Sequence, residues 1–97
     1  MKKKLLLIED EERLGLVLKS FFEKKSFLVE IVKDGEDALF QAESYKPDII
    51  LLDWMLPNMS GLEICRQIRS NKDLKSIPII FLTAKSEQED KLRVRNR

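Results

Sequence analysis

The fold is decided by one stretch of sequence, Ile49-Ile50-Leu51-Leu52-Asp53, in which four apolar residues run directly into an acidic one. A strand that is apolar at every position is expected to be buried on both faces, as in a parallel sheet. A second run, Leu5-Leu6-Leu7-Ile8, is followed in the same way by Glu9 and Asp10. Because the carboxyl ends of neighbouring parallel strands share one crevice, where such sheets bind ligands, we expect these three carboxylates to meet there.

Apolar runs alternate with segments of helical period along the rest of the chain, which predicts a βαβα fold with a parallel sheet. Strands are predicted at 4–8, 28–32, 49–52 and 79–82, and helices at about 11–25, after Asp34, after Ser60 and from near 87. Asp34 is a candidate helix cap, and Ser60 with Glu63 and Ser86 with Glu89 form candidate capping boxes. The first helix is expected to bury one apolar stripe, made of Leu14, Val17, Leu18, Phe21 and Phe22.

Composition limits the class of protein. Ninety-seven residues with 43% hydrophobic content suit one small domain, and a net charge of +1 gives no reason to expect nucleic-acid or anionic-membrane binding. The single cysteine, Cys65, excludes an internal disulfide framework and is expected to be a buried small hydrophobe. The absence of histidine excludes Ser-His and Cys-His nucleophile pairs and His-ligated metals. No apolar run approaches the ~20 residues that span a bilayer, so a cytoplasmic location is expected.

The acidic residues after the first strand bear on the chemistry. A flavin or dinucleotide site needs an amide-presenting loop there, whereas this chain has Glu9-Asp10-Glu11-Glu12, which would repel a phosphate. A two-aspartate phosphatase site needs a second aspartate at position 55, where Met55 stands. The remaining scheme makes Asp53 a nucleophile that attacks phosphorus while Glu9 and Asp10 hold Mg²⁺.

Thr83, at the end of the last predicted strand, could donate a hydroxyl hydrogen bond to a phosphoryl oxygen in this scheme. Each residue also has a simpler interpretation when it is taken alone: Asp10 as a helix cap, Asp53 as a loop carboxylate and Thr83 as a strand-end residue. The combination of all of them at strand ends favours the site.

These residues resemble the receiver domain of two-component response regulators. The resemblance covers residues 3 to about 92 and rests on four segments in order and spacing: Leu7-Ile8-Glu9-Asp10-Glu11, Ile50-Leu51-Leu52-Asp53-Trp54-Met55-Leu56-Pro57, Ser60-Gly61 and Phe81-Leu82-Thr83-Ala84-Lys85. The segment from Asp53 to Pro57 is similar to that of the subfamily whose receivers usually precede a winged-helix DNA-binding domain, and we expect no such domain within these 97 residues. The resemblance implies a flavodoxin-like, doubly wound parallel α/β sheet over residues 1–97, with strand order 2-1-3-4.

The resemblance also implies roles for individual residues. Asp53 would accept a phosphoryl group from a sensor histidine kinase, and Thr83 would be the switch hydroxyl. Mg²⁺ would be held by Glu9, Asp10, Asp53 and the backbone carbonyl of Met55. Such a domain is not an enzyme, beyond self-phosphorylation and self-dephosphorylation, and contacts neither nucleic acid nor membrane itself.

The family's fifth strand, with its phosphoryl-pairing lysine, and its fifth helix are missing from the sequence, so we expect an incomplete, C-terminally truncated receiver. Lys85 matches a different family position beside the site. The strand at 79–82 is then a bare apolar edge, which predicts a homodimer or larger assembly. Two functions remain open: a phosphoacceptor, or a phosphorylation-impaired module that acts by interaction or domain-swapped self-assembly.

Overall fold

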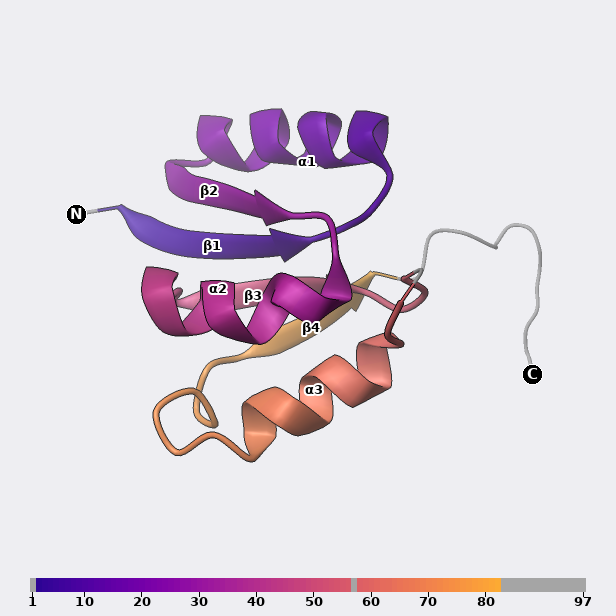
Figure 1. The fold of residues 1–97 in the computed structure, drawn as a ribbon. Helices are drawn as coiled ribbons and strands as arrows, with labels where there is room; N and C mark the ends of the chain where they lie inside the picture. Colours follow the sequence, from indigo (N-terminus) through magenta and orange to yellow (C-terminus); the bar gives the residue numbers. More distant parts are fainter. Residues whose placement is uncertain (1, 57, 83–97) are drawn as a thin grey trace.

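The computed structural model describes residues 2–56 and 58–82, which form a four-stranded sheet and three α-helices (Figure 1). The sheet has the order β2-β1-β3-β4, and every neighbouring pair is parallel, so the predicted strand order is confirmed. In chain order the elements are β1 (Lys3–Ile8), α1 (Glu12–Lys24), β2 (Phe27–Val32), the 3₁₀ turn η1 (Gly35–Asp37), α2 (Ala38–Tyr45), β3 (Ile49–Asp53), α3 (Gly61–Arg69) and β4 (Ile79–Leu82).

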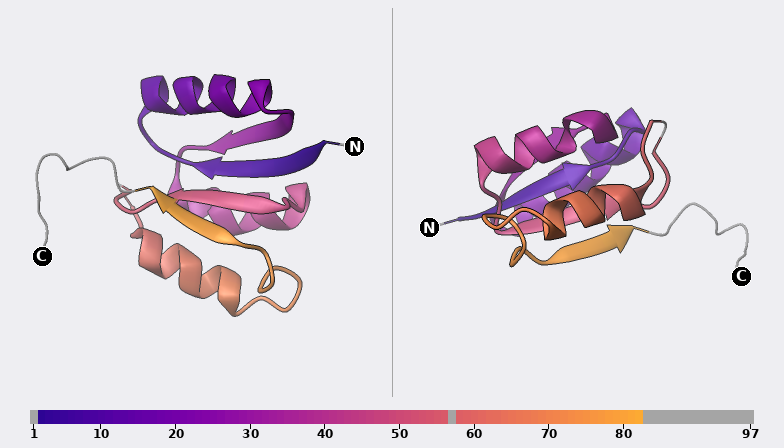
Figure 2. Two further views of the ribbon diagram at one scale, coloured as in Figure 1. Left: turned by 180° about the vertical axis from the view of Figure 1, so that it is seen from behind. Right: turned by 60° about the horizontal axis from the view of Figure 1, so that its bottom comes forward.

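The helices lie on both faces of the sheet. Figure 2 shows α1 on one face and α2 with α3 on the other. Side chains alternate across a strand, so β1 and β3 contribute to both faces, and the last four residues of each strand are buried. Leu6, Ile8, Ile50 and Leu52 pack with Ile64, Ile68 and the alanines of α2, whereas Leu5, Leu7 and Leu51 pack toward α1 with Val29. This double burial explains the continuous apolar runs at 5–8 in β1 and at 49–52 in β3.

The stripe predicted on α1 is only partly buried, which corrects the expectation from the sequence. Leu18 and Phe22 pack against the core, but Val17 is 60% exposed and Phe21 is 50% exposed. The helix packs against β2: a Cβ on Gly15 would lie 3.6 Å from Ile31 Cδ1. Side chains that project toward β3 and β4 therefore have little in the described part of the fold to cover them.

The predicted helix caps at Asp34 and Ser60 are present, but some of their hydrogen-bond partners differ from those expected. Asp34 accepts a hydrogen bond from the Glu36 amide and so begins η1, one turn before α2. Ser60 Oγ accepts from the Glu63 amide at 3.2 Å, but the Glu63 carboxylate pairs with Arg66 and does not complete the capping box. Cys65 is half-buried against the core rather than fully buried. The capping box at Ser86 and the helix near 87 lie outside the described residues.

The described helices are short relative to a bilayer, and none of them is apolar and long enough to span one.

Candidate functional site

The register of the sheet brings the first two acidic groups together. Ile8 pairs with Leu52 across β1 and β3, so the next residues, Glu9 and Asp53, lie side by side where these two strands end. The Glu9 amide donates to the Val32 carbonyl at 2.9 Å, which continues the hydrogen-bond ladder with β2 past the end of β1. Position and direction of these residues are thus set by the sheet itself.

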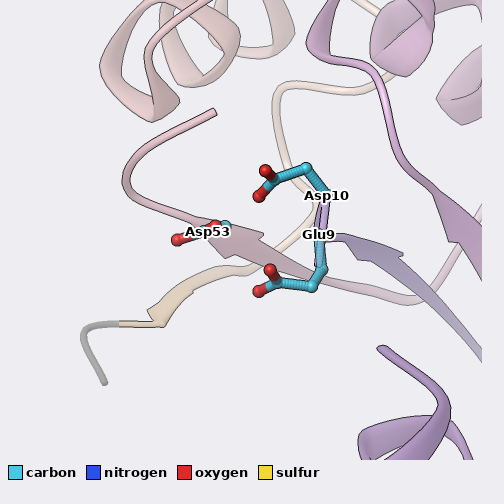
Figure 3. A group of neighbouring side chains, drawn as sticks. All are labelled: Glu9, Asp10 and Asp53. Atoms are coloured by element: carbon cyan, nitrogen blue, oxygen red, sulfur yellow. The ribbon is translucent and has the colours of Figure 1, made fainter. Parts of the chain in front are cut away.

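Glu9, Asp10 and Asp53 form one carboxylate cluster at this end of the sheet. One oxygen from each residue lies within 4.8 Å of those from the other two. Figure 3 shows the three carboxyl groups on the same side of the strand ends. Glu9 is 1% exposed and Asp53 is 2% exposed, whereas Asp10 lies nearer the solvent. Burying two carboxylates beside a third is unfavourable unless a cation or other donors compensate for it.

Backbone amides orient two of these side chains. The Glu11 amide donates to Glu9 Oε2 at 3.0 Å, and the Met55 amide donates to Asp53 Oδ1 at 3.3 Å. Each bond turns the chain back toward the carboxylate two residues earlier. The second bond places the Met55 backbone directly beside the cluster, while its side chain is 67% exposed.

The loop between β3 and α3 is closed tightly behind Met55. The Gly61 amide donates to the Trp54 carbonyl at 3.0 Å. A Cβ on Gly61 would lie 2.7 Å from the Asp53 carbonyl oxygen and 3.1 Å from Trp54 Cα, so only glycine fits at this position. The Trp54 ring packs edge-to-face on Phe81 of β4, with ring centroids 4.8 Å apart.

The donor set fits Mg²⁺. The ion prefers carboxylate, carbonyl and water oxygens at about 2.0–2.1 Å, so two ligands on opposite sides of it lie about 4 Å apart. Carboxylate oxygens within 4.8 Å of one another reach that spacing through small rotations or one intervening water. The described part of the chain offers no histidine or thiolate at this place, which agrees with a hard, oxygen-preferring cation.

The structure therefore brings together the three carboxylates that the sequence predicts, with the Met55 backbone next to them. Asp10 precedes the N-cap residue of α1, which is Glu11 and makes no side-chain cap bond, so Asp10 is not itself the N-cap residue. Asp53 is the last residue of β3 rather than a loop residue. Thr83 and Lys85 lie outside the described residues.

Two features of the site were missed by sequence reasoning. One is the requirement for glycine at position 61, for which Ser60-Gly61 before a helix is only a weak signal. The other is a contact between two loops: Asn58 Nδ2 lies 3.2 Å from Asp34 Oδ1 and 3.1 Å from Asp34 Oδ2. The residues are 24 apart in sequence, and no local pattern links them.

Comparison with known proteins places this geometry in a family. The family model for the response regulator receiver domain matches residues 5–96. The chain is 45% identical over 92 residues to the alkaline phosphatase synthesis transcriptional regulatory protein PhoP of Bacillus subtilis, covering 95% of this chain and 38% of PhoP. It is 47% identical over 89 residues to the response regulator ArlR of Staphylococcus saprophyticus, covering 92% of this chain and 39% of ArlR. The chain thus spans about two fifths of the length of these curated relatives.

A solved structure supports the same assignment. The receiver domain of a sensor histidine kinase from Pseudomonas aeruginosa PAO1 superposes with a TM-score of 0.83 at 33% identity, covering 93% of this chain and 74% of that one. It is described with a magnesium ion coordinated in its active site cleft. This chain belongs to the response regulator receiver domain family.

Proposed function

We propose that this receiver domain is a phosphoacceptor in two-component signalling and that Asp53 is the residue that accepts the phosphoryl group. The observation that carries the proposal is the convergence of Glu9, Asp10 and Asp53 at the carboxyl edge of the sheet. Asp53 comes from β3 and the other two follow β1, so the cluster depends on the fold rather than on one local motif. Carboxylates are suitable nucleophiles for making an acyl phosphate.

The reaction is a transfer of a phosphoryl group between two side chains. A carboxylate oxygen of Asp53 bonds to the phosphorus of a phosphohistidine on a sensor kinase, and the P–N bond breaks. The electron pair of that bond remains on the imidazole nitrogen, which takes up a proton. The Met55 amide, 3.3 Å from Asp53 Oδ1, holds the carboxylate in one orientation for this attack.

Glu9, Asp10, Asp53 and the backbone carbonyl of Met55 are the groups that would hold Mg²⁺. The bound cation would offset the negative charge that accumulates when a phosphate approaches three carboxylates. The Glu11 amide orients the Glu9 carboxyl group, which lies on the same side as the other two carboxyl groups (Figure 3). The resemblance further assigns the switch hydroxyl to Thr83, which would report on the phosphoryl group.

The decisive experiment is to treat the chain with acetyl phosphate and Mg²⁺ and to locate the acyl phosphate by peptide mass spectrometry after borohydride trapping. We expect a single modified residue, Asp53. Asp53→Asn should abolish the modification. Asp48→Asn is the matched control, since it makes the same change at the opposite end of β3.

Modification of Asp48→Asn should equal that of the wild type. Acyl phosphate on another carboxylate in the wild type, or undiminished modification of Asp53→Asn, would contradict the assignment. Omission of Mg²⁺ should reduce the rate, and a rate that is independent of Mg²⁺ would separate the phosphoacceptor role from the metal site.

Exposed apolar side chains favour a second candidate function, self-association. β4 lies at the edge of the described sheet, and its Ile80 is 50% exposed on the α1 side, where Val17 and Phe21 are also exposed. Apolar strand edges are templates for pairing with another chain. A second copy would cover this surface, and Ile80→Lys should then shift the particle toward the monomer. Light scattering that gives a monomer for the wild type at high concentration would exclude this role.

A further inference from the structure

A contact between two loops stands out beside the carboxylate cluster. Asp34 lies just after β2, and Asn58 lies in the loop that leads from β3 to α3. Both loops are at the end of the sheet to which the strand arrows point (Figure 1). Asn58 Nδ2 lies 3.2 and 3.1 Å from the two carboxylate oxygens of Asp34, a charge-assisted contact.

Asp34 is itself firmly placed. Its Oδ1 accepts from the Glu36 amide at 2.9 Å, which fixes the carboxylate at the start of η1. The following residue, Gly35, is packed so closely that a Cβ there would lie 3.0 Å from Ile64 Cδ1 and 3.2 Å from Met59 Cβ. The segment that carries Asp34 is therefore held against the core, and Asn58 binds a carboxylate whose position is fixed.

The loop that carries Asn58 is the one that presents Met55 to the cluster. Its start is set by β3 and by the bond from the Met55 amide to Asp53, and its end is set by the Gly61–Trp54 bond and the Ser60 cap. Met55 lies between these anchors with its side chain in solvent, so side-chain packing does little to hold it. The contact of Asn58 with Asp34 attaches this loop to a residue outside it.

We propose that Asp34 and Asn58 act as a positioning pair, which fixes the β3–α3 loop so that the Met55 carbonyl is held in place for the metal. The Mg²⁺ part of this inference rests on the function proposed above. Groups that orient metal ligands from outside the ligand set commonly change metal affinity by about 10–100-fold when they are removed. The Glu36 amide and then the Asn58 amide hold the pKa of Asp34 below its usual value, which agrees with both bonds being made to the ionised carboxylate.

The test compares two alanine variants that lose the same kind of bond. Asn58→Ala removes the contact with Asp34. Asn71→Ala removes the 2.8 Å bond from Asn71 Nδ2 to Glu43 Oε2 and the bond that Asn71 Oδ1 accepts from the Asp73 amide, in the segment between α3 and β4. Neither variant changes the net charge or any proposed ligand. Mg²⁺ binding is measured by calorimetry at fixed ionic strength, with amide hydrogen exchange of the Mg²⁺-free proteins as the second readout.

We expect Asn58→Ala to weaken Mg²⁺ binding about tenfold, the lower end of the range for orienting groups, and to speed exchange of the Met55 amide. Asn71→Ala should alter neither. The exchanged pair Asp34→Asn with Asn58→Asp keeps one donor facing one carboxylate, so it should restore both readouts toward the wild type. Equal Mg²⁺ affinities in the two alanine variants, or failure of the exchanged pair to restore binding, would overturn the proposal.

Hydrogen exchange separates this proposal from the proposed function. If the wild type binds no Mg²⁺, the metal site fails and the metal part of the inference fails with it. In that case faster exchange at Met55 in Asn58→Ala still supports the fastening of the loop, and unchanged exchange overturns that part as well.

Discussion

The two ends of the sheet use charged and polar side chains in opposite ways. At the amino end, Asp48 Oδ2 accepts from the Lys4 amide at 2.7 Å, and Lys4 Nζ donates to the Tyr45 carbonyl at 2.8 Å. The Tyr45 hydroxyl donates to the Leu28 carbonyl at 3.0 Å, so these side chains fasten β1, β2, α2 and β3 to one another. At the carboxyl end, Glu9, Asp10 and Asp53 place like charges within 4.8 Å of each other.

The difference separates the interactions that stabilise the fold from the side chains that form the candidate site. Donors and acceptors that meet across elements stabilise the folded state, each by about 0.5–1.5 kcal/mol. Converging carboxylates have the opposite tendency, because their mutual repulsion disfavours the folded state and a bound cation would offset it. Sequences usually satisfy local stability rules except at functional sites. The same residue type therefore has opposite effects at the two ends.

The largest expected effect comes from making one substitution at both ends. Asp53→Asn, without Mg²⁺, should raise the free energy of unfolding by about 1–3 kcal/mol, since it removes one of three like charges at short range. Asp48→Asn should lower it by about 0.5–1 kcal/mol, because the amide oxygen accepts from Lys4 without the charge. Urea unfolding followed by circular dichroism measures both. Two changes of the same sign would break the comparison.

Mg²⁺ should act on one end only. At a free concentration ten times its dissociation constant, a ligand that binds only the folded state stabilises it by about 1.4 kcal/mol. We expect this increment in the wild type and in Asp48→Asn, and its loss in Asp10→Asn combined with Asp53→Asn. Unfolding curves with MgCl₂, compared with NaCl at equal ionic strength, give the increment. A similar gain in the double variant would place the bound ion elsewhere.

The sheet could be predicted well from the sequence because burial of a strand determines which residue types it contains. Strands buried on both faces read as continuous apolar runs, and the acidic residues that end those runs mark their carboxyl ends. The meeting of Glu9, Asp10 and Asp53 was predictable because neighbouring parallel strands share one carboxyl edge. The strand order was predictable once the family resemblance supplied the topology. The register that places Glu9 beside Asp53 is the structural reason for the cluster.

The features that could not be predicted depend on contacts between distant segments. Helical periodicity groups Val17 and Phe21 with Leu18, but it cannot tell how much of the sheet lies beneath each of them. The contact between Asp34 and Asn58 joins two loops whose separation in space follows from the packing of η1 against α3. The Glu63 carboxylate also accepts a hydrogen bond from Arg66 instead of the predicted one from the Ser60 amide. Residue spacing alone does not show which of these two donors it binds.

A smaller effect should distinguish the amino end at high pH. Burial raises the pKa of the Tyr45 hydroxyl above 10.0, and the charges of Glu30 and Asp48 raise it further. The neutral hydroxyl therefore contributes stability below about pH 10, and this contribution is lost as the pH rises through the higher pKa of the folded state. Tyr45→Phe should lower the free energy of unfolding by about 0.5–1.5 kcal/mol near neutral pH, with the deficit shrinking at high pH. Urea unfolding of both proteins from pH 8 to 11 measures it, and a deficit that grows with pH would contradict the assignment.

The smallest effect belongs to the carboxyl end at low pH. The Glu36 amide and then the Asn58 amide lower the pKa of Asp34 below 3.8 by bonding to its ionised form. The resulting stability is present above pH 3.8 and is lost as the pH falls through the lower folded-state pKa. Asn58→Ala removes the second donor and keeps the first, so the pKa should rise part of the way toward 3.8. Carboxyl-carbon NMR titration of Asp34 in both proteins gives the shift. An unchanged pKa would mean that Asn58 does not engage Asp34 in solution, and the two loops would then be fastened by core packing around Gly35 alone.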